Sequence, residues 1–210
     1  MNDLFLTSFF SNVSGLFVNY SKQVHVGKKI TFIPTAANPE KVTFYVDADK
    51  RALASIGFVI DEIDISVADH QSIKAKINEN EYVFVSGGNT FFLLQEMKRT
   101  GTDVLLAEEL RKGKKYIGSS AGSIILSANI EYVKGMDSPK KAPLLSDYAS
   151  LGIIDFYPLP HYSNAPFKKI AEKIVEEYSG TIDLRPMSND QAIIVNGDQA
   201  ITIRKKEKSE

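Results

Sequence analysis

The 210-residue sequence contains no cysteine. It therefore forms no disulfide, offers no thiolate ligand to zinc and has no cysteine nucleophile. An excess of charge of one sign is also missing, because 25 Lys and Arg are balanced by 26 Asp and Glu, for a net charge of -1. That balance gives no support for nucleic acid or an anionic membrane surface as a partner.

Long apolar runs are absent as well, and no stretch approaches the roughly 18 residues that a membrane span requires. Residues 1–10 lack the basic and apolar regions of a signal peptide. Hydrophobic residues make up 43% and charged residues 24% of the chain, which is ordinary for a globular protein. We therefore expect a soluble, cytoplasmic protein, either a monomer or a homodimer, with one domain over residues 1–210.

Short apolar runs alternate with amphipathic stretches, a pattern that predicts β-α units and an α/β fold. We predict strands at residues 4–8, 29–34, 58–65, 81–85, 115–117 and 152–159. Helices are predicted at residues 39–56, 69–77, 90–97, 102–111 and 165–178, with an irregular segment at 134–146. Asn196-Gly197 lies between two alternating apolar runs, 191–195 and 199–203, and predicts a C-terminal β-hairpin.

The segment 118–122 reads Gly-Ser-Ser-Ala-Gly and fits the G-x-S-x-G pattern, with Ser120 at its centre. In that pattern a serine occupies a strained turn from strand to helix, and its Oγ is exposed above the sheet. Small flanking residues are needed because the turn brings backbone close to backbone. The alternative interpretation is a helix cap, since serine commonly precedes a helix. Ser119 and Ser123 are less well placed to act as nucleophiles.

A second glycine loop, Gly87-Gly88-Asn89, also follows a buried run and precedes a predicted helix. Its chemistry would be to bring a backbone N–H towards a developing oxyanion. The alternative is a phosphate-binding loop, but the sequence contains neither G-x-x-x-x-G-K-[ST] nor G-x-G-x-x-G after a first strand. We therefore predict no nucleotide and no other cofactor or metal.

Three histidines are available as a general base. His25 has polar neighbours and is expected to be exposed, and His70 lies at a predicted helix start. His161 follows the run Phe-Tyr-Pro-Leu-Pro at the end of a predicted strand. Open α/β sheets place their sites at the carboxyl ends of strands, which favours His161. The alternative is a buried histidine with a structural role.

Three motifs occur in order: GGNT at 87–90, GSSAGS at 118–123 and FYPLPHYSN at 156–164. Together they resemble the peptidase E family of serine peptidases, and the likeness covers most of the chain. It implies a three-layer α/β/α fold with a mostly parallel central sheet, of the class I glutamine amidotransferase type. It also implies Ser120 as nucleophile and His161 as base. The amides of Gly88 and Ala121 would hold the oxyanion, and Asn89 would line a site for a short peptide.

The acid of the family's triad comes from a late turn or from the loop after the nucleophile. In the late turn the family's glutamate is missing, and its place falls on Asn189 or Asp190. The loop candidate is Asp137. We expect Asp137 or Asp190 in preference to Asn189, because an aspartate also stabilises the imidazolium. An ordinary turn residue remains the alternative for each.

Peptidase E enzymes cleave dipeptides that begin with aspartate, and a basic residue after the catalytic histidine helps to recognise that side chain. Here the loop is short and lacks an arginine, and Lys168 and Lys169 are placed on the polar side of a predicted helix. We expect a strict preference for N-terminal aspartate to be weakened or lost. Two other functions stay open: a cyanophycinase-like hydrolase of β-aspartyl peptides, and an amidotransferase-like domain that binds a small molecule without turnover.

Overall fold

A computed structural model describes residues 3–197 and 200–205. Its main sheet has seven strands in the order β3-β2-β4-β5-β1-β8-β9. The strands are β1 (Asp3–Thr7), β2 (Lys29–Ile33), β3 (Val59–Glu62), β4 (Tyr82–Val85), β5 (Lys115–Ser119), β8 (Gln191–Asn196) and β9 (Ala200–Lys205). The first five pair in parallel, whereas β8 runs antiparallel to β1 and β9 antiparallel to β8.

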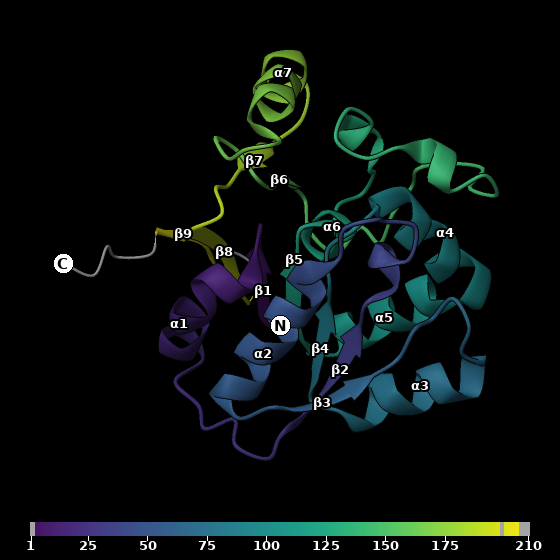
Figure 1. Ribbon diagram of the computed structural model, residues 1–210, viewed down its shortest axis with the longest axis vertical. Helices are drawn as coiled ribbons and strands as arrows, with labels where there is room; N and C mark the ends of the chain where they lie inside the picture. The colour runs from purple at the N-terminus through teal and green to yellow at the C-terminus, as the bar shows by residue number, and fades with distance from the viewer. Residues whose placement is uncertain (1–2, 198–199, 206–210) are drawn as a thin grey trace.

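Helices cover both faces of this sheet, which gives the expected three-layer α/β/α arrangement (Figure 1). The long helices of the body are α1 (Phe10–Ser21), α2 (Phe44–Ile56), α3 (His70–Glu79), α4 (Thr90–Thr100) and α5 (Thr102–Arg111). One apolar core unites side chains of α1 and α2 with one face of the sheet. The other core unites those of α3, α4 and α5 with the opposite face. No described helix is both long and apolar enough to cross a membrane.

A small second sheet lies beyond the carboxyl ends of the main strands. It consists of β6 (Tyr157–Leu159) and β7 (Leu184–Pro186), which pair in parallel and are joined through helix α7 (Lys168–Tyr178). In Figure 1 this lobe stands at the top of the view, clear of the main sheet. The prediction of a strand over 152–159 was therefore too long. Residues 150–154 instead lie beside residues 125–128, which follow α6 (Ala121–Ile124), and their N–H groups donate to the carbonyls of that segment.

The sequence did not reveal helix α1. Its N-cap is Phe9, whose side chain makes no capping hydrogen bond, and its first turn has no acidic residue. Gly15 in its middle weakens the helical pattern further. What stabilises α1 is tertiary packing, because Phe10, Val13 and Phe17 are buried against the sheet.

The irregular segment predicted at 134–146 contains only the short helix η3 (Pro139–Lys141), and η2 (Glu131–Val133) precedes it. The predicted helix at 39–56 starts later, as α2, and the predicted strand at 58–65 ends earlier, as β3. The C-terminal hairpin is present, with Asn196 paired to Ala200. Residues 198–199, which follow the predicted turn Asn196-Gly197 and include the first residue of the second predicted run, lie outside the described residues.

Candidate active site

Ser120 occupies a sharp turn between β5 and the short helix α6. Its backbone has φ 50° and ψ -108°, a combination that non-glycine residues rarely adopt. Two glycines permit the turn. A Cβ on Gly122 would lie 2.1 Å from the carbonyl oxygen of Val85, and one on Gly118 would lie 2.7 Å from that of Gly122. The G-x-S-x-G pattern is therefore a packing requirement of this turn.

Strand β1 anchors the turn from the other side. The N–H of Ser120 donates to the carbonyl of Thr7 at 2.8 Å. Ser123 Oγ donates to the same carbonyl and accepts from the Thr7 N–H at 2.9 Å. Ser123 thus ties the turn to β1. Helix α6, which follows Ser120, has only four residues.

The glycine loop lies beside the turn, after β4. Gly88 has φ 137°, and a Cβ there would lie 2.1 Å from the carbonyl oxygen of Ala36. The next residue, Asn89, donates its N–H to that carbonyl at 2.7 Å, and its side chain caps α4 by accepting from Phe92 N–H. The N–H groups of Gly88 and Ala121 make no hydrogen bond among the described residues, so both donors are free.

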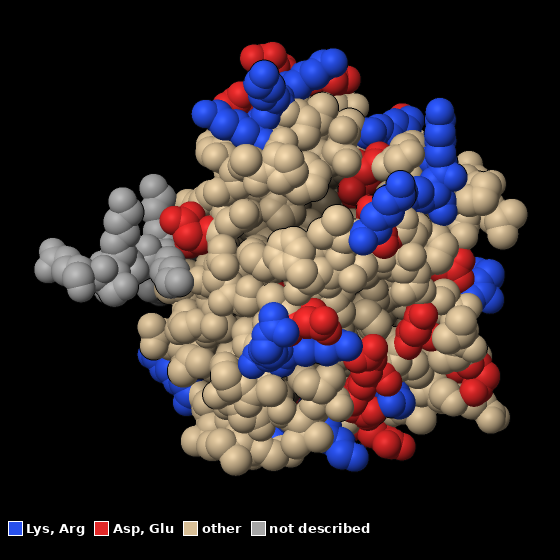
Figure 2. Space-filling model, viewed as in Figure 1, with Lys and Arg blue, Asp and Glu red and all other residues tan. Residues whose placement is uncertain are grey.

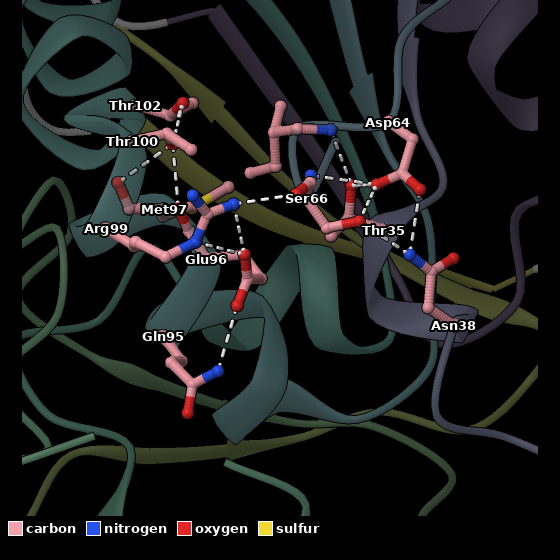
Figure 3. Close-up of polar contacts among 11 residues, drawn as sticks. Thr35, Asn38, Asp64, Ser66, Gln95, Glu96, Met97, Arg99, Thr100 and Thr102 are labelled. Carbon is pink, nitrogen blue, oxygen red and sulfur yellow. Dashed lines mark hydrogen bonds and ion pairs between the residues drawn. The ribbon is translucent and has the colours of Figure 1, made fainter. Parts of the chain in front are cut away.

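A polar network fixes the segment around Ala36, whose carbonyl accepts from the glycine loop (Figure 3). Ala36 belongs to the short helix η1 (Thr35–Ala37), and Thr35 Oγ1 donates to Asp64 at 2.8 Å. From α4, Arg99 bonds to the carbonyl of Ser66 and to the buried Glu96. The network therefore joins η1, whose Ala36 carbonyl accepts from Asn89, to the segment after β3 and to helix α4.

His161 and Asn189 meet because β6 and β7 pair in parallel. Leu159 is opposite Pro186, so the residues that follow each strand emerge side by side. His161 Nδ1 lies 2.7 Å from Asn189 Oδ1, and His161 Nε2 lies 2.9 Å from Ser120 Oγ. Since an amide oxygen only accepts, Nδ1 carries the proton and Nε2 is free to accept one from the serine.

Burial lowers the pKa of His161, and the hydrogen bond to Asn189 opposes that effect. The imidazole is therefore neutral near pH 7, the form that a general base requires. Its ring stacks on Phe167 with 4.9 Å between centroids. Its backbone N–H donates to Ser8 Oγ, which in turn donates to the carbonyl of Met187.

Neither aspartate that we expected to orient His161 bonds to it. Asp137 instead accepts from the N–H and Oγ1 of Thr90 at the start of α4. Asp190 is exposed and accepts from Ser188 Oγ. For Asp190 the reason is the register of β6 and β7, which places position 189 and not 190 against the imidazole.

The other histidines lie away from this site. His25 was expected to be exposed but is buried, stacked on Phe58 at 4.6 Å and bonded to Ser21 Oγ. His70 begins α3 and is exposed, with Nδ1 bonded to the carbonyl of Thr100. No group of three His, Cys, Asp or Glu among the described residues could hold a metal ion.

A cleft of about 570 Å³ opens over Ser120. Its walls include the apolar residues Phe9, Val42, Phe44, Tyr45, Ile124, Met136, Pro166 and Phe167. The glycine loop, His161, Asn189 and Ser8 line it too, together with the polar residues Glu40, Asp137, Ser138 and Lys141. In Figure 2 the surface is hollowed beneath the lobe of α7, among mostly uncharged atoms with charged ones to the right of the hollow.

Sequence reasoning missed Ser8 and Tyr45. Ser8 follows β1 directly, next to β5 in the sheet, so the topology would have placed it beside Ser120. No sequence signal marks Tyr45, since it reaches the cleft through the tertiary packing of α2.

A family model described as peptidase family S51 matches residues 4–203. The chain belongs to this family. It is therefore a serine-type peptidase, and the expected resemblance to peptidase E is confirmed. Membership decides against a domain that merely binds a small molecule.

Among the relatives of this chain, an uncharacterized peptidase of Listeria monocytogenes is 50% identical over 204 residues, and the match covers 97% of this chain and 99% of that protein. Another uncharacterized peptidase, from Pasteurella multocida, is 49% identical, and the match covers 96% of this chain and 97% of that protein. Peptidase E of a Nostoc species is 33% identical over 138 residues, and the match covers 66% of this chain and 54% of that protein.

Two solved structures are similar to this chain. The crystal structure of a Listeria monocytogenes protein assigned to peptidase E has a TM-score of 0.94 at 48% identity, covering 99% of this chain and all of that one. A peptidase from an acI-B1 Actinobacterium has a TM-score of 0.72 at 18% identity, covering 98% and 88%, and shares the fold.

Proposed function

We propose that this family S51 member hydrolyses short peptides through an acyl-enzyme on Ser120, with His161 as general base and Asn189 as the residue that orients His161. One observation carries the proposal: the continuous chain of hydrogen bonds from Ser120 Oγ through both imidazole nitrogens to Asn189. Nucleophile, base and orienting group within hydrogen-bond reach are the geometric signature of covalent catalysis.

The steps follow from this geometry. His161 Nε2 takes the proton of Ser120 as Oγ bonds to the scissile carbonyl carbon. The carbonyl oxygen becomes an oxyanion, and the free N–H groups of Gly88 and Ala121 stabilise it. His161 then gives its proton to the leaving amine as the C–N bond breaks. A water molecule, deprotonated by the same nitrogen, releases the acid and restores Ser120.

Asn189 performs half of the task of a carboxylate. Its oxygen fixes the tautomer of His161, but its neutral amide gives no Coulomb attraction to the imidazolium that forms during attack. Burial of His161 disfavours that cation further. We infer a slow peptidase whose base is fully active at neutral pH.

The cleft favours substrates with apolar side chains over those with an N-terminal aspartate. Among the described residues that line it, Lys141 is the sole cation, and Glu40 already pairs with it at 2.7 Å. An aspartate side chain would have to compete for that lysine. Val42 and Phe44 are 61% and 64% exposed at the rim, an arrangement typical of an apolar binding surface.

The test combines a fluorophosphonate probe with a panel of X-Leu dipeptides, applied to the wild type and to Ser120→Ala. We expect labelling and turnover of the wild type alone, with apolar X at least as good as Asp. No labelling and no turnover would refute the proposal, and turnover of Asp-Leu alone would refute the substrate preference. Hydrolysis restricted to β-aspartyl peptides would favour the cyanophycinase-like alternative.

A further inference from the structure

Asp49 is a buried carboxyl in an otherwise apolar interface. Helices α1 and α2 lie on the same face of the main sheet (Figure 1). The buried residues of α2 are Val46, Asp49 and Leu53, and Asp49 is 0% exposed. A carboxylate that loses its water costs folding free energy unless hydrogen bonds replace that water. Packing alone therefore does not explain an aspartate at this position.

The hydrogen bonds of Asp49 replace only part of the lost water. Oδ1 accepts from the N–H of Ser11 at 3.0 Å, whereas Oδ2 is buried and has no partner among the described residues. Burial raises the pKa of Asp49 to about 7, and hydrogen bonding to the Ser119 hydroxyl and to the Ser11 N–H opposes that rise only in part. The fold thus retains a charge that it does not fully compensate, which is typical of a functional position.

One partner of Asp49 belongs to the nucleophile turn. Ser119 ends β5 and directly precedes Ser120. Its buried Oγ accepts from the N–H of Phe10 at 3.4 Å, and its hydroxyl proton is available to Asp49. Ser119 is therefore held by α1 on one side and by α2 on the other. Because the backbone of Ser120 is strained, the place of its Oγ depends on neighbours that hold the turn.

The other partner of Asp49 belongs to the start of α1. Phe9, the N-cap of α1, makes no side-chain hydrogen bond, and Asp49 supplies an acceptor from α2 through the N–H of Ser11. A negative charge at this end of the helix is also favoured by the helix dipole. Ser11 lies three residues after Ser8, whose Oγ accepts from the N–H of His161 at 3.0 Å. Asp49 therefore contacts supports of both the nucleophile and the base.

We propose that Asp49 is a positioning residue, which binds Ser119 and the first turn of α1 and thereby holds Ser120 within hydrogen-bond reach of His161. The proposal rests on the proposed function, because Asp49 would serve the same pair of catalytic groups. Asp49 is not among the described residues that line the cleft, so it touches neither the substrate nor the reacting atoms. Its loss should lower the rate of attack by Ser120 and leave substrate binding unchanged.

The main test variant is Asp49→Asn, which keeps the size of the side chain and an oxygen for the Ser11 N–H but removes the charge. It is compared with the wild type at pH 8, where Asp49 is mostly ionised. We expect kcat for an X-Leu dipeptide and the rate of fluorophosphonate labelling to fall by roughly 10-fold each, as for a weakened hydrogen bond to a charged group. KM should stay within about 2-fold of the wild type.

Asp47→Asn is the matched control, because Asp47 is exposed on the same helix and its replacement removes the same charge. It should leave kcat and the labelling rate unaltered. Urea unfolding of each variant gives its folded fraction, so that rates are compared per folded molecule. If Asp49→Asn kept the wild-type kcat and labelling rate, Asp49 would serve stability alone and the proposal would be wrong.

A double-mutant cycle tests whether Asp49 acts through Ser119. Ser119→Ala removes the hydroxyl and should by itself slow labelling by roughly 10-fold. The variant that carries both Asp49→Asn and Ser119→Ala should also be slowed by roughly 10-fold in total, because each change removes the same interaction. A total loss of about 100-fold would show that the two residues act independently, and would contradict the proposal.

The outcomes separate the positioning role from the proposed function. If the wild type is labelled and Asp49→Asn raises KM without lowering kcat, Asp49 shapes the cleft, so the positioning role is refuted and the peptidase stands. Absence of labelling and turnover in the wild type refutes the proposed function, and the positioning role with it.

Discussion

The two halves of the candidate active site are built in different ways. Ser120 lies at the end of β5, a central strand with parallel neighbours on both sides, and the sheet itself holds its turn. His161 and Asn189 instead follow β6 and β7, two strands of three residues each in a separate sheet. Ser8 bridges the halves, because its hydroxyl bonds to the N–H of His161 and to the carbonyl of Met187.

This difference separates what each half requires. The nucleophile depends on close backbone packing, so it is sensitive to a single added methyl group. The base depends on the pairing of two short strands and on one side-chain amide, so substitutions there can change its orientation and pKa without disrupting the fold. Substitutions on the nucleophile half should abolish folding of the site, whereas those on the base half should change rate and pH dependence.

The largest effect is expected from Gly122→Ala. The new Cβ would lie 2.1 Å from the Val85 carbonyl oxygen, so the turn must move. We expect a loss of about 3 kcal/mol or more in the free energy of unfolding, and no turnover. Gly15→Ala is the matched control, since nothing lies within 4 Å of its Cβ and it is within α1, where alanine stabilises by about 0.5–1 kcal/mol. Urea unfolding measures both, and equal stability of the two variants would contradict this account.

Asn189→Ala should have the next largest effect, a loss of kcat. Without the amide oxygen, His161 loses its orientation and its fixed tautomer, and kcat should fall by about 10²–10³-fold with little change in stability. Asp190→Ala is the control and should keep kcat within about 2-fold of the wild type, because Asp190 is exposed and its carboxylate accepts a hydrogen bond from Ser188 and from no other described residue. Steady-state kinetics on one dipeptide decides, and a larger loss in Asp190→Ala would show that the acid partner is Asp190.

Ser8→Ala tests the bridge between the halves. It leaves the N–H of His161 without its partner and removes one of the two donors to the carbonyl of Met187, which keeps the N–H of Tyr162. We expect kcat to fall by roughly 10-fold. Ser55→Ala removes an exposed hydroxyl that bonds only within α2 and should leave kcat unaltered. A rate for Ser8→Ala equal to that of the wild type would mean that the lobe keeps His161 in place unaided.

Asn189→Asp should have the smallest effect, a shift in pH dependence. A carboxylate at Nδ1 attracts the imidazolium and raises the pKa of His161, which burial lowers in the wild type. Because the neutral imidazole is the active base, the acid limb of kcat/KM should move to higher pH by about one unit. Asp190→Asn, which removes a nearby exposed charge, should barely move the limb. A shift of the Asn189→Asp limb to lower pH would contradict the assignment of His161 as base.

The parts that could be predicted from the sequence are those with local causes. Ser120 and the glycine loop are marked by small residues where strands end, and the α/β fold follows from the alternation of apolar runs. The partner of His161 could not be predicted, because it depends on the register of β6 with β7. A shift of one residue in that register decides between Asn189 and Asp190. Helix α1 was missed for a similar reason, since packing and not its own sequence stabilises it.

The central claim is that Ser120 is the nucleophile, and mass spectrometry of the fluorophosphonate adduct tests it most directly. After labelling and proteolysis, fragmentation of the peptide that carries residues 118–123 distinguishes Ser119, Ser120 and Ser123. We predict a single adduct on Ser120, formed much more slowly in His161→Ala. An adduct on Ser119 or Ser123, or labelling that does not depend on His161, would contradict the claim.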